Sequence, residues 1–275
     1  MFLQCGQFKL SLERPLIMGI LNITPDSFSH DGLLAKPDAA FEYAMQLMED
    51  GADLLDIGGE STRPGATPVS ADEEIARVMP ILELLVSRNI PVSIDTQKPV
   101  VMQAAIGAGA AMINDVNALQ AEGALDIIAN SSVAVCLMHK QGNPQTMQMS
   151  PQYQDVVSEV AMSLRSCIDR ALEANIALDR ITIDPGFGFG KSIEHNLDML
   201  AHLSDFKALG VPLLVGLSRK SMLGQITGRS VHERLSASVA AAVLSVMKGA
   251  NIVRVHDVKA TKDALAVVRA VEGAL

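Results

Sequence analysis

Eight short apolar runs, separated by segments with helical periodicity, constrain the fold of this chain more than any other feature. The runs are continuous rather than alternating with polar residues, which is typical of parallel strands covered on both faces. They lie at 16–22, 53–58, 91–95, 111–116, 133–139, 181–184, 212–218 and 251–256. This alternation predicts a single (β/α)8 TIM-barrel domain over residues 1–275. A doubly wound open sheet is the alternative, because the pattern does not itself show that the sheet closes.

Local signals mark the ends of some elements. Residues 72–88 carry an apolar helical stripe, and Ser70 with Glu73 predicts a capping box at its start. Pro80 lies inside that stripe, so we expect a kink or an early end of the helix there. The alternating stretch before Pro15 predicts a short strand pair that caps the bottom of the barrel.

Charge and cysteine content exclude several classes of protein. The net charge is −9, and the lysines and arginines are scattered, which argues against binding to nucleic acid or to anionic membranes. The beginning of the chain does not read as a secretory signal, and the most apolar later stretch, 235–253, is too short and too mixed to span a bilayer. Three cysteines without C-x-x-C spacing indicate a reducing compartment. We therefore expect a cytoplasmic protein.

Polar residues stand where the predicted strands end, and the carboxyl ends of barrel strands meet on the face that builds active sites. For any single position, capping of the following helix is the alternative explanation. Polar endings on so many strands, with both signs of charge, nevertheless favour a site. They are Asn22, Asp56, Asp95, Asn114, Asp115, His139, Asp184, Ser218, Arg219, Lys220, Arg254 and His256, and Met138 precedes His139.

These side chains are chemically complementary. Asp95, Asn114 and Asp184 supply the acceptors that a flat heterocycle with ring N–H and amino groups requires. Lys220 and Arg254 add positive charge, and a guanidinium can stack on an aromatic ring.

A second set of polar residues suits an anionic ligand. Asn22, Arg63 and His256 could meet an anionic leaving group or its metal ion. Two long polar segments, 22–37 and 58–70, follow the first two strands, and long loops at that end of a barrel are usually functional lids or disordered.

At this point several motifs resemble one family in order and over essentially the whole chain. The sequences "NITPDSF" (22–28), "GGESTRPG" (58–65), "DPGFGFGKS" (184–192) and "GLSRKS" (216–221) resemble dihydropteroate synthase, and the match is closest to the bacterial folate-biosynthesis enzymes. The resemblance implies an enzyme that joins 6-hydroxymethyl-7,8-dihydropterin diphosphate to p-aminobenzoate and releases pyrophosphate with the help of Mg²⁺.

The resemblance also implies a role for individual residues. The pterin site would comprise Asp95, Asn114, Met138, Asp184, Lys220 and Arg254. The p-aminobenzoate site would comprise Phe28, Thr62, Pro64, Phe189 and Ser221. Pyrophosphate would contact Asn22, Arg63, Arg254 and His256, with Asn22 as the ligand of Mg²⁺. Arg63, Asp95 and Lys220 would be the catalytic residues of a dissociative, SN1-like displacement.

The same residues allow other interpretations. A pterin-binding methyltransferase module would share the acceptors but would not need Arg63 or Ser221. A nucleotide-binding P-loop is excluded because Pro185 stands where its first glycine is required. A non-catalytic homologue is expected to lose a pocket residue, and none is lost. Lys191 is left open between a solvated helix start and a neighbour of phosphate, and His30 is read as a loop variation. The family often forms homodimers, and the Ala- and Ser-rich helix at 235–247 offers a close-packing face, with packing inside the barrel as the alternative explanation.

Overall fold

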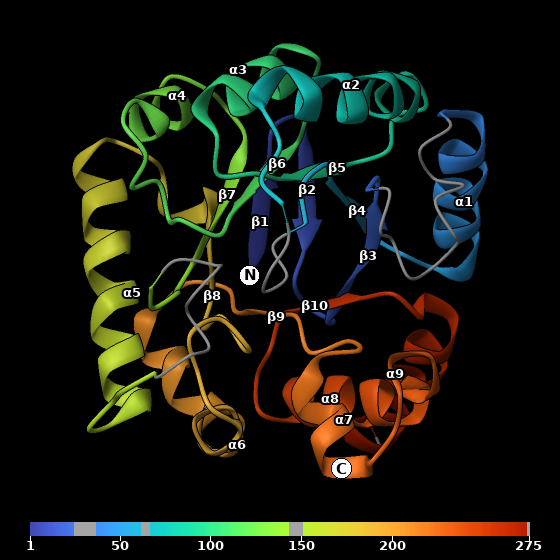
Figure 1. Cartoon of the computed structure of the whole chain (residues 1–275), viewed down its shortest axis with the longest axis vertical. Helices are drawn as coiled ribbons and strands as arrows, with labels where there is room; N and C mark the ends of the chain where they lie inside the picture. Colours follow the sequence, from blue (N-terminus) through green and yellow to red (C-terminus); the bar gives the residue numbers. More distant parts are fainter. Residues whose placement is uncertain (25–36, 62–66, 143–150, 274–275) are drawn as a thin grey trace.

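The chain folds into a ring of parallel strands surrounded by helices (Figure 1). The computed structural model describes residues 1–24, 37–61, 67–142 and 151–273. The strands of the ring are β3 (Leu16–Asn22), β4 (Leu54–Gly58), β5 (Val92–Asp95), β6 (Met112–Asp115), β7 (Ala134–Met138), β8 (Ile181–Asp184), β9 (Leu214–Val215) and β10 (Ile252–Val255). The helices around it are α1 (Pro37–Asp50), α2 (Ala71–Ser87), α3 (Pro99–Gly107), α4 (Ala124–Ala129), α5 (Val156–Glu173), α6 (Ile193–Ala201), α7 (Ser221–Thr227), α8 (Leu235–Met247) and α9 (Val258–Glu272). Short 3-10 turns lie at η2 (Leu178–Arg180), η3 (Leu203–Leu209) and η4 (Val231–Glu233).

The strand order shows that the sheet closes. The order is β8-β7-β6-β5-β4-β3-β10-β9, so each strand lies beside its neighbours in the chain. A parallel bridge between Ile183 and Leu213 joins the two ends, where the Ile183 N–H donates to the Pro212 carbonyl at 3.0 Å. A doubly wound sheet would instead reverse its strand order near the middle. The barrel prediction is confirmed, and the open-sheet alternative is wrong.

Two details differ from the sequence-based expectation. Of the predicted strand 212–218, Leu214 and Val215 pair with β10 and Leu213 bridges to Ile183, after which the chain turns into the segment that carries Lys220. Helix α2 runs through Pro80 to Ser87, so the expected early end there is wrong. The Ser70 hydroxyl accepts the Glu73 N–H, but the Glu73 carboxylate pairs with Arg77, so only half of the predicted capping box forms.

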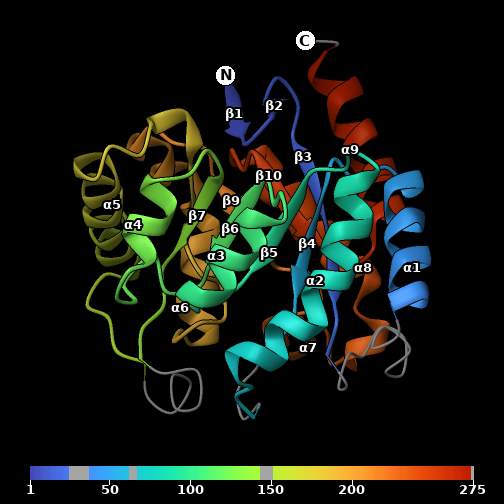
Figure 2. The same ribbon diagram turned by 90° about the horizontal axis from the view of Figure 1, so that it is seen from above.

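A strand pair closes the bottom of the barrel, as predicted. Strands β1 (Phe2–Cys5) and β2 (Phe8–Ser11) form an antiparallel hairpin at the end of the ring where the strands begin (Figure 2). Its side chains Leu3 and Cys5 are fully buried against the first residues of the barrel strands, among them Leu16 and Ile252. The hairpin therefore excludes water from that end of the barrel.

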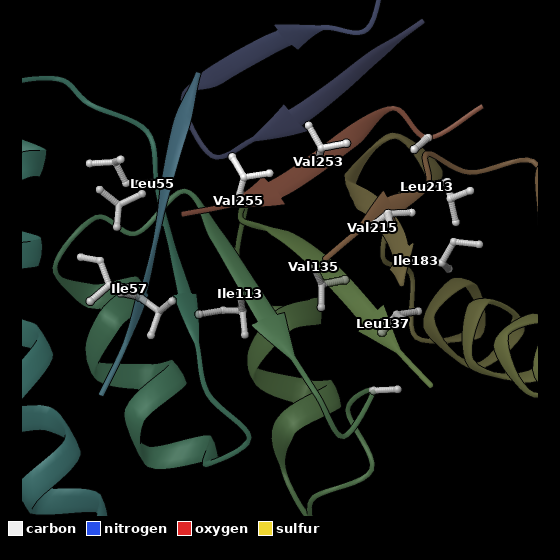
Figure 3. Close-up of a cluster of buried hydrophobic side chains, with 14 of the residues drawn as sticks. Leu55, Ile57, Ile113, Val135, Leu137, Ile183, Leu213, Val215, Val253 and Val255 are labelled. Atoms are coloured by element: carbon white, nitrogen blue, oxygen red, sulfur yellow. The ribbon is translucent and has the colours of Figure 1, made fainter. Parts of the chain in front are cut away.

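Alternation along each strand separates the core from the site. Residues such as Ile57, Val135 and Val255 point outward into the apolar layer between sheet and helices (Figure 3). The residues between them point into the ring, where Leu54 and Ile252 form an apolar layer near the hairpin. On β4, β6 and β10 the next inward positions are polar, namely Asp56, Asn114 and Arg254. No helix of the described residues is long and apolar enough to cross a membrane.

Candidate active site

The inward polar layer brings together the strand-end residues that the sequence singles out. Side chains from five different strands share this layer because each stands two residues beyond an inward apolar position or at a strand's last residue. These residues are Asp56 on β4, Asp95 on β5, Asn114 on β6, Asp184 on β8 and Arg254 on β10, with Met138 ending β7 beside Asp184. The sequence-predicted pterin residues therefore converge as expected.

Arg254 bridges two carboxylates across the ring. Its Nε donates to Asp56 Oδ2 at 2.5 Å, and its Nη2 donates to Asp95 Oδ2 at 2.9 Å. The side chain of Asp56 is fully buried, and that of Asp95 is 12 % exposed. Two ion pairs at this depth fix the guanidinium plane, so Arg254 is held in place before any ligand arrives.

Asp56, which the sequence marks only as a polar strand ending, also belongs to this inward layer. Its Oδ2 also accepts a hydrogen bond from Asn114 Nδ2 at 3.2 Å. This contact orients the Asn114 amide, because the nitrogen faces Asp56 and the carbonyl oxygen is left for a ligand. The inward register of Asp56, two residues after Leu54, is the sequence signal that points to this role.

Two carboxylate oxygens in this layer have no partner. Asp56 Oδ1 and Asp95 Oδ1 are buried and accept no hydrogen bond from the residues that the structure describes. Burial raises the pKa of Asp95 to about 7, against the opposing effect of Arg254. Unpaired buried acceptors cost free energy, so their presence at the end of the barrel indicates a ligand that brings N–H donors.

Asp184 leads into a tight turn that completes the pocket. Its Oδ1 accepts the Gly186 N–H at 2.7 Å, and burial raises its pKa. Lys220 reaches the same turn from the other side, where its Nζ donates to the Phe187 carbonyl and lies 4.7 Å from the centre of the Phe189 ring. Burial lowers the pKa of Lys220 to about 8, while Asp184 opposes that shift.

The turn depends on glycine at position 186. Gly186 has φ +72°, and a Cβ there would lie 1.8 Å from the carbonyl oxygen of His139. Gly123 also has a positive φ, +82°, but a Cβ there would meet nothing within 4 Å. Gly123→Ala should cost about 1–2 kcal/mol of unfolding free energy for the left-handed backbone alone.

Gly186→Ala is expected to cost a further ~1–3 kcal/mol, because its methyl group must displace β7 from β8. Urea unfolding of the two variants beside the parent chain measures the difference. Equal losses in the two variants would show that the turn has room for a side chain.

The segment after β9 is fixed by its own contacts. Ser218 Oγ lies 2.9 Å from His256 Nδ1, and Arg219, at φ +58°, pairs with Asp257 at 2.7 Å. Arg234 Nη1 donates to the Arg219 carbonyl at 3.0 Å. These contacts aim Lys220 into the pocket and place Ser221 at the exposed first residue of α7.

Two of the predicted pyrophosphate residues, Asn22 and His256, lie where neighbouring strands end. Asn22 is the half-buried last residue of β3, and His256 directly follows the neighbouring strand β10. Glycine at position 58 makes room for Asn22, because a Cβ there would lie 3.3 Å from Asn22 Oδ1. Among the described residues no three His, Cys, Asp or Glu side chains are grouped to hold a metal ion.

Several sequence-predicted residues lie outside the described residues, and the structure does not test them. They are Phe28, His30, Thr62, Arg63 and Pro64. The described ends of the second loop are tied down: Glu60 Oε1 accepts the Val69 N–H at 3.0 Å, and Lys98 Nζ pairs with Glu60 at 2.8 Å and with Glu74 at 2.5 Å.

Comparison with known proteins identifies the family. A family model described as "Pterin binding enzyme" matches residues 18–256. The dihydropteroate synthase of Neisseria meningitidis serogroup B is 51% identical over 271 residues, which cover 96% of this chain and 95% of the relative.

Two solved structures have nearly the same fold. Dihydropteroate synthase from Xanthomonas albilineans with 4-aminobenzoic acid has a TM-score of 0.92 and 52% identity, covering 98% of both chains. That from Burkholderia cenocepacia complexed with 7,8-dihydropteroate has a TM-score of 0.91 and 50% identity, covering 99% of this chain and 97% of that one. These likenesses leave no room for the methyltransferase alternative. The chain belongs to the dihydropteroate synthase family.

Proposed function

We propose which residues of this barrel bind each substrate of the dihydropteroate synthase reaction. That reaction forms 7,8-dihydropteroate and pyrophosphate from the pterin diphosphate and p-aminobenzoate. The observation that carries the proposal is the pair of unpartnered buried oxygens, Asp56 Oδ1 and Asp95 Oδ1, beside Asn114 and Asp184. A dihydropterin presents ring N–H and amino donors along one edge, which suit these acceptors. The pterin lies in the inward polar layer, with Met138 as its apolar wall and Lys220 and Arg254 as its cations.

The displacement is dissociative in this proposal. The C–O bond to the diphosphate breaks with its electron pair going to the leaving oxygen, and the pterin methylene carries the positive charge. The amine nitrogen of p-aminobenzoate then bonds to that carbon and loses a proton to the released pyrophosphate or to water. Three carboxylates, Asp56, Asp95 and Asp184, face two cations, Lys220 and Arg254, so the ionised pocket has a negative balance that favours a cation.

Mg²⁺ is proposed at the mouth, with Asn22 as its protein ligand. The amide oxygen of Asn22 is a hard donor in a half-buried position next to Gly58. A single protein ligand fits this ion, because Mg²⁺ keeps several waters and takes further oxygens from substrate phosphates. When bound, the ion would supply charge neutralisation for the leaving pyrophosphate. In this proposal His256, Arg63 and Arg254 contact the same pyrophosphate.

The p-aminobenzoate site is proposed nearer the surface. The X. albilineans relative binds 4-aminobenzoic acid, which supports such a site in this family. Of the residues assigned to it, Phe189 stands on the turn after β8, and Ser221 is exposed at the start of α7. Backbone N–H groups at a helix start favour a carboxylate. Phe28, Thr62 and Pro64 complete the site in this proposal.

Arg63→Ala tests the proposed leaving-group role. If Arg63 neutralises charge on the departing pyrophosphate, its loss should lower kcat by about 10²–10³ and change the Kd of the pterin diphosphate far less. Pyrophosphate release, measured with both substrates and Mg²⁺, gives kcat, and calorimetry gives the Kd. Equal losses in the two quantities would contradict this role.

A homodimer is also proposed, through the outer face of α8. The exposed residues Ser236, Ala240, Leu244 and Met247 follow one another at helical spacing and carry no charge. Leu244 is 46% exposed and Met247 is 64% exposed. An uncharged stripe of this kind on a surface helix is typical of an interface.

Leu244→Glu should therefore convert a dimer into a monomer, because the dimer would have to bury an unpaired charge. Leu172→Glu on α5 is the matched control, since Leu172 is 40% exposed and lies on another helix. Analytical ultracentrifugation over a range of concentrations measures the state. A monomeric parent chain, or dissociation by both variants, would contradict the proposal.

We finally propose a cytoplasmic location. Cys5, Cys136 and Cys167 are all free thiols and all buried. Free cysteines suit a reducing compartment.

A further inference from the structure

Lys191 ends the motif that carries Asp184 and Phe189, and its side chain is directed inward. The residue is 2% exposed. Its Nζ donates to the carbonyls of Gly186 at 2.9 Å and Phe189 at 3.1 Å, and it lies 2.9 Å from His139 Nδ1. It is therefore neither a solvated helix start nor placed to bind a phosphate.

The two carbonyls belong to opposite ends of one turn. The Phe189 N–H donates to the Gly186 carbonyl at 3.1 Å, which closes a four-residue turn, and Lys191 binds that turn from inside. His139 directly follows β7, so the amine also ties the turn to the neighbouring strand. Lys220 holds the same turn from the pocket side through the Phe187 carbonyl.

The Lys191 amine can hydrogen-bond to both carbonyls and to His139 whether it is protonated or neutral. Burial lowers the pKa of Lys191 to about 7, with Asp184 opposing the shift. Burial and the charge of Lys191 lower the pKa of His139 to about 3, so its ring is neutral. A neutral imidazole nitrogen accepts from an ammonium or, in the other tautomer, donates to a neutral amine.

The turn and Asp184 are held by different means. The backbone of Asp184 is fixed by the sheet, since Asp184 pairs with Met138 and its carbonyl accepts the His139 N–H at 2.9 Å, while its Oδ1 contacts the near end of the turn through the Gly186 N–H at 2.7 Å. Phe189 lies beyond the sheet, at the end of the turn whose carbonyls Lys191 binds. Loss of Lys191 should therefore move Phe189 more than Asp184.

We propose that Lys191 is a positioning residue, which holds the 186–189 turn so that Phe189 forms a wall of the p-aminobenzoate site. The inference rests on the proposed assignment of Phe189 to that substrate. Lys191 itself touches neither substrate. It acts through the turn, so its removal should weaken recognition of one substrate and leave the other nearly unchanged.

Lys191→Met is the test, because methionine has a similar length and no donor. Arg180→Met is the matched control. Arg180 binds the Val133 carbonyl at 2.9 Å and the Ile128 carbonyl at 2.8 Å, and so ties β8 to its neighbours at the opposite end of the same strand. Thermal melting measures stability, steady-state kinetics give the KM for p-aminobenzoate, and calorimetry gives the Kd for the pterin diphosphate.

Both variants should melt at lower temperature. In Lys191→Met alone, the KM for p-aminobenzoate should rise about tenfold to a hundredfold, as expected when a binding wall moves by ~1 Å. The pterin Kd should change less than about threefold in both variants. Lys191→Arg, which keeps a cationic donor, should recover part of the KM. If Lys191→Met does not fold, Lys191→Gln takes its place with the same expected split.

An unchanged KM in Lys191→Met, or equal rises in KM for Lys191→Met and Arg180→Met, would overturn the inference. Phe189→Ala separates this failure from a failure of the underlying assignment. If Phe189→Ala raises the KM for p-aminobenzoate and Lys191→Met does not, Lys191 is not a positioning residue. If Phe189→Ala leaves that KM unchanged, the assignment of Phe189 is wrong and the inference falls with it.

Discussion

Arg254→Gln is expected to destabilise the barrel and to abolish most of its activity. Arg254 is the cation that binds both Asp56 and Asp95, and the Asp56 side chain is fully buried. Removing one partner of a buried ion pair leaves an uncompensated charge, at a cost of about 3–5 kcal/mol. At roughly 2–4 °C per kcal/mol for a large domain, Tm should fall by about 6–20 °C. The loss of a fixed charge from the site should lower kcat by about 10²–10³.

The loss of stability in Arg254→Gln should become smaller as the pH falls. In Arg254→Gln the Asp95 carboxyl loses the cation that opposes its desolvation, so its folded-state pKa rises further above the unfolded value of about 3.9. A carboxyl group with a raised folded-state pKa destabilises the fold once it ionises, and this penalty disappears as the pH falls through that pKa. The difference in unfolding free energy from the parent chain should therefore shrink between about pH 8 and pH 5.

A double variant separates charge balance from chemistry. Asp56→Asn with Arg254→Gln removes the more deeply buried of the two carboxylates together with the cation that it shares with Asp95, and the amide oxygen introduced by the first substitution can still accept from Asn114. We expect the double variant to regain much of the lost Tm and none of the lost kcat. Arg14→Gln is the control, because Arg14 pairs with Asp53 at the exposed surface, where such pairs contribute less than about 1 kcal/mol. A double variant no more stable than Arg254→Gln would show that charge balance is not the cause.

The sequence indicated much of this site because strand ends are marked locally. A continuous apolar run that stops at Asp95 or Asp184 shows both the strand and the polar residue that ends it. Once a parallel barrel is inferred, its topology brings those residues together. The acceptor layer could therefore be predicted without any knowledge of distances.

Roles that arise from contacts across the ring could not be predicted in this way. Asp56 gains its importance from Arg254, which is 198 positions away, and no local pattern records that pair. The sequence leaves Lys191 open between a solvated helix start and a neighbour of phosphate, because the burial of a side chain depends on what packs over it. Strand β9 is shorter than predicted for a related reason. The chain leaves the ladder after Val215 to form the turn with Lys220. The apolar residues that follow Val215 are buried without being paired.

Lys220 and Asp184 each limit the shift that burial produces in the pKa of the other. Lys220 lies deep enough for burial to lower its pKa to about 8, and Asp184 opposes that shift. Lys220 in turn opposes the rise in the pKa of Asp184. A change at one of these residues therefore alters the protonation of the other, and their variants should not act additively.

Asp184→Asn should remove pterin recognition while leaving the turn intact. The asparagine Oδ1 can still accept the Gly186 N–H, a bond of 2.7 Å in the parent chain, so Tm should stay close to that of the parent. The second oxygen becomes an NH₂ group, which presents donors to the donors of the pterin. A site built to hydrogen-bond its substrate typically loses about 10⁴ in kcat/KM when one such match is lost.

The same variant should also shift the alkaline limb of the pH profile. Without the Asp184 charge, the pKa of Lys220 falls below its value of about 8 in the parent chain. Any residual activity that needs the ammonium should therefore decline at a lower pH than in the parent. Asp184→Ala is the comparison, because it loses both the ligand contact and the Gly186 contact and should melt well below Asp184→Asn. Calorimetry with the pterin diphosphate decides the matter: binding by Asp184→Asn within about threefold of the parent would remove Asp184 from the pterin site.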